Sequence, residues 1–131
     1  MLSDAAVKPV FPEGARRSGD GAACSLEPAG RDGGARLDVR LSAAGTANAV
    51  RRHEADRRRD TAAHVVRAVH SVGDAAYSWS SIEAPGVRRA EVRARVGGRL
   101  LSVWIWGPAA DAEALAVSVA ESVAERVREY G

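Results

Sequence analysis

The chain has 131 residues, a length that fits one domain with a core of its own and no need of disulfides or metals. Its formal charge is +2, and a charge this small does not by itself indicate a nucleic-acid or membrane partner. Cys24 is the only cysteine, which excludes an internal disulfide and a cysteine-based zinc site.

A short helix is expected at the start of the chain. Ser3 and Asp4 are typical helix-start residues, and Pro9 and Pro12 end the element after one or two turns. Residues 13–22 are rich in Gly, Arg, Ser and Asp and therefore predict a loop.

A β-hairpin is expected next. Residues 36–42 alternate between apolar and polar side chains, so their leucines and valine share one face of a strand. Residues 23–27 supply the partner strand, with Cys24 at an inward position. The Asp-Gly-Gly sequence at residues 32–34 is a strong signal for the turn between them.

An arginine-rich helix is predicted from Thr46 to about Asp60, with Thr46 or Asn48 as the N-cap. Few of its residues are apolar, so we expect it to lie on the surface and to be loosely held. Glu54 and Asp56 lie three or four residues from arginines, and we expect these charges to pair along the helix.

Three strands are expected in the second half of the chain. Residues 63–72 leave helix and strand both open, and residues 75–81 predict a strand. Residues 87–96 and 99–106 then alternate on either side of Gly97-Gly98, a sequence typical of a two-residue hairpin turn.

That turn predicts the register of the last hairpin, with Val96 opposite Arg99. One face carries apolar pairs: Ala94 and Leu101, Val92 and Val103, and Ala90 and Ile105. The other face carries mostly polar and aromatic pairs: Arg95 and Leu100, Arg93 and Ser102, Glu91 and Trp104, and Arg89 and Trp106. The apolar face is expected to face the core.

A final amphipathic helix follows Asp111, its expected cap. Its apolar stripe recurs at helical spacing and consists of Ala112, Leu115, Ala116, Val119, Val123 and Val127. The fold class that follows is a single α+β domain over residues 1–131. It has an antiparallel sheet of about five strands packed against the C-terminal helix, a short N-terminal helix and the polar, arginine-rich middle helix.

No motif in the chain indicates catalysis, and we expect no enzyme. His53, His64 and His70 lack the spacing of a helical metal pair, so no metal site is expected. Cys24 is expected to be a buried, inert thiol. Gly97-Gly98 lies between strands and does not form a phosphate loop before a helix. We therefore expect no catalytic residue and no cofactor.

The tryptophans form the most informative pattern. Trp104 and Trp106 fall on the polar face of the last hairpin, and Trp79 can join them from the neighbouring strand. Arg89 lies opposite Trp106 and can stack on it by a cation–π contact. Together with Arg93 these residues form the candidate binding surface, for an unknown protein or a small apolar ligand. The alternative is that a loop or the arginine-rich helix covers the rings.

Several short segments occur in a familiar order. Residues 2–7 (LSDAAV), 23–26 (ACSL) and 72–77 (VGDAAY) precede the Gly97-Gly98 hairpin and a terminal helix of alanine and valine. This order resembles a family of actinobacterial surface lipoproteins of unknown function with a PsbP-like domain. The resemblance implies an antiparallel sheet with helices packed against it, and an accessory or ligand-binding role outside the cytoplasm. It implies no catalytic residues.

Our first hypothesis is therefore a non-enzymatic binding or accessory domain of the cell-envelope type. The alternative is a cytoplasmic regulatory or protein-interaction domain that uses the arginine-rich helix and binds an acidic partner in a salt-sensitive way. Nucleic acid is not expected as a partner. A third hypothesis, an enzyme of unrecognised type, requires a deep pocket with perturbed titratable groups.

Localisation follows from the same alternatives. No segment is apolar enough to span a membrane, and no signal peptide is visible, so the chain as written is expected in the cytoplasm. If the resemblance holds and the N-terminus is truncated, the cell envelope is expected instead.

Overall fold

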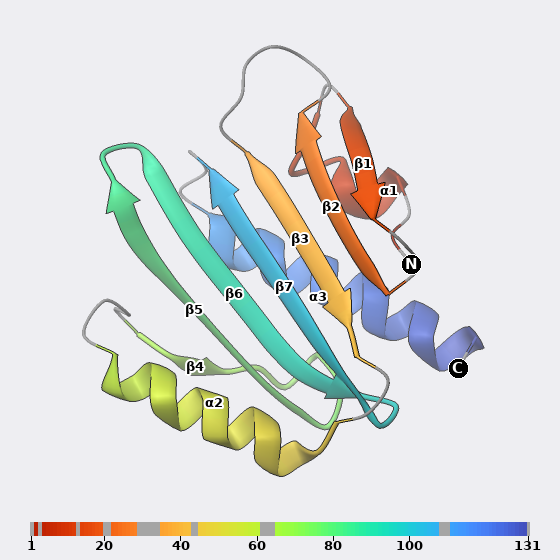
Figure 1. Ribbon diagram of the computed structural model, residues 1–131, viewed down its shortest axis with the longest axis vertical. Coiled ribbons are helices and arrows are strands. Elements are labelled where there is room, and N and C mark those ends of the chain that lie inside the picture. Colours follow the sequence, from red (N-terminus) through yellow and green to blue (C-terminus); the bar gives the residue numbers. More distant parts are fainter. Residues whose placement is uncertain are drawn as a thin grey trace.

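The computed structural model describes residues 2, 4–12, 14–19, 22–28, 35–42, 45–60, 65–107 and 111–130. These form one antiparallel sheet of seven strands with helices on its two faces (Figure 1). The helices are α1 (Asp4–Val7), α2 (Ala47–Arg59) and α3 (Ala112–Tyr130). The strands are β1 (Ala15–Gly19), β2 (Ala23–Pro28), β3 (Arg36–Leu41), β4 (Arg67–Ala68), β5 (Ala75–Ala84), β6 (Val87–Val96) and β7 (Arg99–Gly107).

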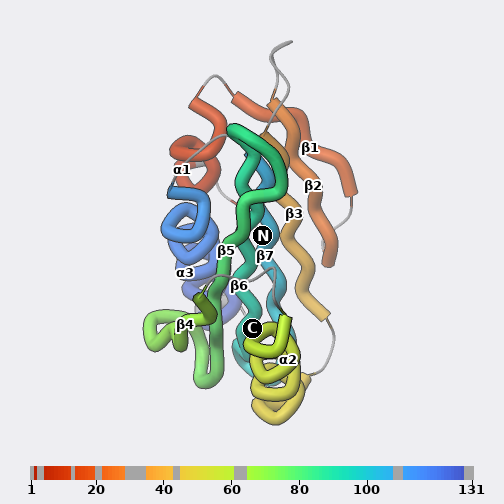
Figure 2. The backbone as a smooth tube through the Cα atoms, turned by 90° about the vertical axis from the view of Figure 1, so that its left-hand side faces the viewer, coloured from red at the N-terminus to blue at the C-terminus, as the bar shows by residue number. Residues whose placement is uncertain are grey.

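The strands lie side by side in the order β1-β2-β3-β7-β6-β5-β4. Helix α3 packs across β6, β7 and β5 on one face, and α1 contacts α3 on that side (Figure 2). Helix α2 packs against β5 and β6 on the opposite face. The prediction of an α+β domain with an antiparallel sheet and a packed C-terminal helix is confirmed.

The main core lies between α3 and the apolar face of the sheet. The inward residues of the central strands are almost fully buried: Leu37, Val39, Ala90, Val92, Ala94, Leu101, Val103 and Ile105. Small side chains on α3 let the helix lie close to the sheet, and these are Ala112, Ala116, Val119, Ala120, Val123 and Ala124. Most of the predicted stripe therefore faces the core, as the 3.6-residue spacing requires.

The predicted register of the last hairpin is confirmed at every position. Val96 pairs with Arg99, Val92 with Val103, and Arg89 with Trp106. Gly97 and Gly98 have φ values of 57° and 77°, which is the left-handed backbone that a two-residue hairpin turn requires. The hairpin of β2 and β3 is also present, although its predicted turn at residues 32–34 lies outside the described residues.

The sheet contains seven strands, two more than the number of about five that the sequence predicts. The predicted loop at residues 13–22 contains β1, which pairs with β2 from Ala15 to Gly19. Four of the five β1 residues are exposed, because an edge strand with no apolar alternation is held mainly by backbone hydrogen bonds. Strand β4 is only two residues long and lies in the segment where helix and strand were both open.

Helix α2 begins where the sequence predicts. The Thr46 side chain accepts a hydrogen bond of 3.1 Å from the Ala49 amide, so Thr46 is the N-cap. The expected charge pairs are present, since Arg58 binds Glu54 at 2.8 Å and Arg59 binds Asp56 at 2.9 Å. Within the described part of the chain, no helix is long and apolar enough to cross a membrane.

Candidate binding face

The face of the sheet opposite α3 carries the polar and aromatic pairs of the last hairpin. Helix α2 covers β5 and β6 on this side, and none of the described helices packs on the same face of β7, β3 or β2. We call the uncovered region around Arg36, Arg89, Trp104 and Trp106 the open face. Both tryptophans are partly exposed there.

The three tryptophans form a continuous row. Trp79 and Trp104 meet edge to face, with ring centroids 6.0 Å apart and planes at 89°. Trp104 and Trp106 stack with centroids 5.7 Å apart and planes at 18°, because they are two residues apart on β7 and point the same way. Trp79 is fully buried in this structure, so its inclusion in an exposed candidate surface is wrong.

Guanidinium groups cover the faces of these rings. Arg36 lies 5.9 Å from the centroid of Trp106. Arg89 lies 5.0 Å from Trp79 and 5.5 Å from Trp104, so the predicted stacking of Arg89 on Trp106 is wrong. The physical reason is a 2.7 Å ion pair with Glu83 of β5, which draws the Arg89 side chain toward β5 and away from Trp106.

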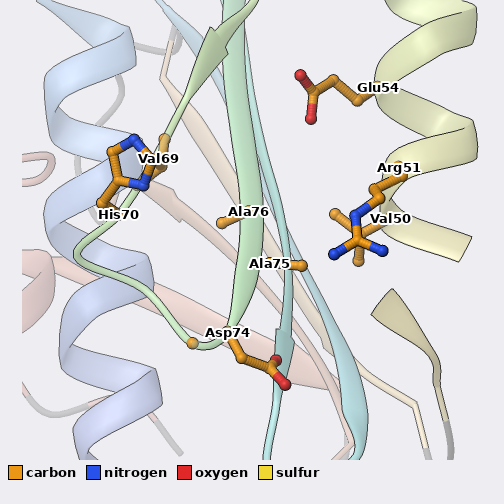
Figure 3. Close-up of a pocket in the computed structure, with 9 residues that line it drawn as sticks. Val50, Arg51, Glu54, Val69, His70, Asp74, Ala75 and Ala76 are labelled. Carbon is orange, nitrogen blue, oxygen red and sulfur yellow. The ribbon is translucent and has the colours of Figure 1, made fainter. Parts of the chain in front are cut away.

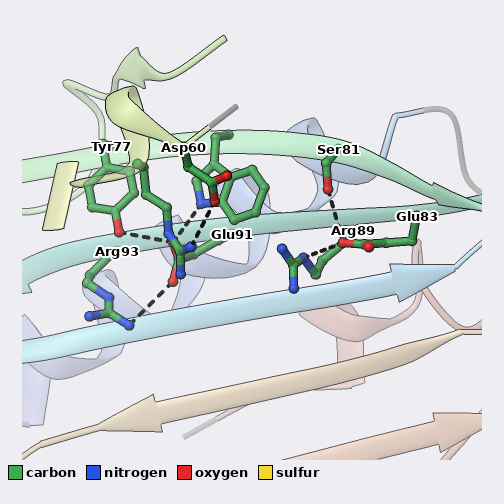
Figure 4. A network of polar contacts seen from close by, with 9 residues as sticks. Asp60, Tyr77, Ser81, Glu83, Arg89, Glu91 and Arg93 are labelled. Carbon is green, nitrogen blue, oxygen red and sulfur yellow. Dashed lines mark hydrogen bonds and ion pairs between the residues drawn. The ribbon is translucent and has the colours of Figure 1, made fainter. Parts of the chain in front are cut away.

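Beneath α2 lies a carboxylate that is fully buried, that of Glu91. Its Oε1 accepts hydrogen bonds from the Trp79 indole at 2.6 Å and the Tyr77 hydroxyl at 2.9 Å (Figure 4). The Arg57 Nε lies 3.3 Å from the same oxygen, and Arg93 donates to Oε2 at 3.3 Å. A charge without access to water needs such partners, and the cluster supplies four of them.

The Glu91 cluster perturbs two neighbouring titratable groups. Burial, reinforced by the Glu91 charge, raises the pKa of the Tyr77 hydroxyl well above its usual 10.0. Burial and the positive charge of Arg93 lower the pKa of His53 below its usual 6.5. Tyr77 is therefore held as a neutral donor, and His53 is biased toward its neutral form.

Helix α2 is more firmly attached than the sequence suggested. Its Val50 is buried against Tyr77 and Trp79, and its Arg57 reaches the buried Glu91. The prediction of a loosely held surface helix is therefore wrong for these two positions. Arg57 also covers one side of Trp104, so the alternative in which the arginine-rich helix covers the rings is correct in part.

The structure places all five predicted site residues on one face of the sheet. Four of them are partly exposed, namely Arg89, Arg93, Trp104 and Trp106, whereas Trp79 is buried. Sequence reasoning missed the residues that organise them, namely Arg36, Arg57, Tyr77 and Glu91. The register did place Glu91 directly opposite Trp104 in the sheet. An acidic residue among aromatic neighbours on one sheet face was the signal that could have identified a buried carboxylate.

The histidines and the cysteine, which the sequence offers as further reactive side chains, lie outside this cluster. Among the described residues, no three His, Cys, Asp or Glu side chains could hold a metal ion. His64 lies outside the described residues, and His53 and His70 are both exposed. Cys24 is a free thiol that is partly, not fully, buried.

Described residues line a pocket on each side of β5. One has a volume of about 350 Å³ and lies between α2 and the start of β5, with Arg51, Glu54, His70 and Asp74 at its walls (Figure 3). The other, of about 540 Å³, lies between β4, β5 and the start of α3. Its wall includes Ser78, whose hydroxyl donates a 2.7 Å hydrogen bond to Glu113.

No protein-family model matches the chain, and no curated protein matches it in sequence.

Proposed function

We propose that this chain is a non-enzymatic binding or accessory domain whose contact surface is the open face. The observation that carries the proposal is the stacked pair Trp104 and Trp106 of β7, partly exposed on the part of this face that none of the described helices covers. Tryptophan and arginine are among the residues that contribute most energy at protein interfaces. Here Trp106 lies between Arg36 of β3 and Arg89 of β6 in the sheet.

The orientation of the rings favours a protein partner. The two rings stack on each other, and the guanidinium of Arg36 lies over Trp106, so the broad ring faces are largely occupied. The ring edges and the indole N–H groups remain, and both are electropositive. Of the three indole N–H groups, only that of Trp79 donates a hydrogen bond to another described residue. The indole N–H groups of Trp104 and Trp106 can therefore donate hydrogen bonds to backbone carbonyls or carboxylates of a partner.

The same surface is less suited to a flat apolar ligand or a sugar ring, which would need a free aromatic face to stack on. The arginine-rich helix is less suited to a role as the contact surface. Its Arg58 and Arg59 are already paired with acids on the same helix, and Arg57 turns inward to Glu91. An acidic partner would have to compete with those contacts.

Site-directed photocrosslinking in the source cells tests the proposal. Trp106 is replaced by benzoylphenylalanine, an aromatic residue that crosslinks on irradiation, and the adducts are identified by mass spectrometry. The matched control carries the same residue in place of Glu121, an exposed position of α3 on the opposite side of the molecule. We expect a defined adduct from position 106 and none from position 121. Equal adducts from both positions, or none from position 106, would contradict the proposal.

The resemblance to envelope lipoproteins supports a place in the cell envelope for this binding role. An immunoblot of fractionated source cells tests that part separately. A membrane-associated or secreted band supports it. A cytosolic band at the calculated mass of 13.7 kDa would instead favour an intracellular partner.

A further inference from the structure

The guanidinium of Arg57 lies inside a cage made by the sheet. Its carbon is 4.9 Å from the ring centroid of Trp79 and 5.6 Å from that of Trp104, and the two rings stand at 89° to each other. Its Nε lies 3.3 Å from the carboxylate of the fully buried Glu91. Two perpendicular aromatic rings with a carboxylate at the base form the arrangement by which proteins recognise cationic ligands.

The cage and its occupant belong to different parts of the fold. Trp79, Glu91 and Trp104 lie at matching positions on β5, β6 and β7, where they are direct neighbours in the sheet. Arg57 comes from α2, in which Val50 is the one buried residue. A helix with so little buried surface opens more readily than three paired strands. The cage walls therefore persist when α2 moves away from the sheet.

The chemistry of the cage favours a guanidinium over other cations. A planar guanidinium can lie flat on an indole and still donate to a carboxylate, whereas an ammonium is a strongly hydrated point charge. The same two rings already hold a second guanidinium, that of Arg89, at 5.0 Å and 5.5 Å. Glu91 has two cationic partners among the described residues, Arg57 and Arg93. Loss of Arg57 would leave this buried carboxylate with Arg93 alone, which favours binding of another cation.

We propose that Trp79, Trp104 and Glu91 form a binding site for an arginine side chain of a partner protein, and that Arg57 occupies this site until α2 is displaced. In this arrangement α2 acts as an internal competitor, and its residue 57 mimics the incoming arginine. The site shares Trp104 with the open face but does not depend on binding there.

Methylguanidinium serves as the probe for the site, and Arg57→Ala empties the cage. We expect millimolar methylguanidinium chloride to raise the Tm of Arg57→Ala and to shift the indole N–H resonances of Trp79 and Trp104, while equal sodium chloride does neither. The wild-type protein, whose cage is filled, should respond little. Addition of Trp104→Ala should weaken the response about tenfold, since one aromatic wall is lost.

Arg89→Ala provides the matched control. Arg89 contacts the same two rings, but its ion-pair partner is the half-exposed Glu83 instead of Glu91. We expect no rescue of Arg89→Ala by methylguanidinium. The proposal is overturned if Arg57→Ala does not respond, or if Arg89→Ala responds equally.

If Arg57→Ala does not fold, Arg57→Met keeps the apolar stem and removes the charge, and the same titration applies to it with the same criteria. The readout needs no biological partner. A failed titration would therefore reject the cage while leaving the crosslinking test at Trp106 untouched, and a failed crosslink would leave the cage in place.

Discussion

Replacing Glu91 by glutamine tests whether the buried carboxylate fastens α2 to the sheet. The substitution keeps the shape of the side chain and removes its charge. Two donors, the Trp79 indole and the Tyr77 hydroxyl, keep an acceptor oxygen but lose a charged one. Arg57 and Arg93 lose their ionic partner, and the new amide presents N–H groups toward donors.

The cost follows from the exposure of the groups left behind. Breaking a buried pair costs about 3–5 kcal/mol when the remaining charge is shut away from water. Here the remaining charges are arginines whose side chains are 30% and 19% exposed, so water can partly replace the lost carboxylate. A neutral glutamine also avoids the desolvation cost of a buried carboxylate, which offsets a further part of the lost stability. We expect a net loss of about 2 kcal/mol in the free energy of unfolding, or about 8 °C in Tm for a domain of this size.

Glu54→Gln is the control, because Glu54 also pairs with an arginine of α2 but is partly exposed to water, whereas Glu91 is fully buried. We expect it to cost less than about 0.5 kcal/mol. Both variants are compared with wild type by urea unfolding followed through tryptophan fluorescence. If Glu91→Gln is no more destabilising than Glu54→Gln, the buried carboxylate does not organise this face and our reasoning about α2 is wrong.

Three further predictions follow from the backbone and from the shifted pKa values. Gly73→Ala should destabilise the protein by at least about 1 kcal/mol more than Gly86→Ala in the same urea assay. Both glycines have positive φ, so the backbone cost is shared. A Cβ at Gly73 would clash with the backbone carbonyl of Arg95 in β6, whereas a Cβ at Gly86 meets open space. The pKa of Tyr77 is raised in the folded state, so stability should be complete below pH 10.0 and decline as the pH rises above it, and Tyr77→Phe should flatten that decline in alkaline melting curves. The pKa of His53 is lowered in the folded state, so the contribution of its neutral form to stability should be complete above pH 6.5 and be lost as the pH falls. Arg93→Ala should raise this pKa in an NMR titration of the imidazole. An unchanged pKa would show that the charge of Arg93 does not act on His53.

Local alternation was sufficient to predict the central hairpins. Gly97-Gly98 fixes a two-residue turn, and the apolar residues on either side then permit only one register. The same rule predicted that α3 would cover the apolar face. These features depend on residues close together in sequence, where the pattern alone determines the pairing.

The parts that were missed depend on contacts between distant segments. Strand β1 carries almost no apolar signal, because its residues face solvent and only its backbone pairs with β2. The inward turn of Arg57 follows from a single carboxylate on β6, 34 positions later in the chain. From the polar composition of the helix alone, Arg57 is expected to be one more exposed charge. The burial of Trp79 likewise depends on where α2 lies over the sheet, which the sequence of α2 does not state.

Whether Trp104 and Trp106 form an open face in solution is decided by the access of solvent to the three indole N–H groups. The groups are resolved by NMR and assigned with single Trp→Phe variants, and a soluble paramagnetic agent is then added. We predict that the Trp79 signal, from a group bonded to buried Glu91, is retained while those of Trp104 and Trp106 are attenuated. Equal protection of all three would show that the face is covered in solution, and the binding role proposed for it would be contradicted.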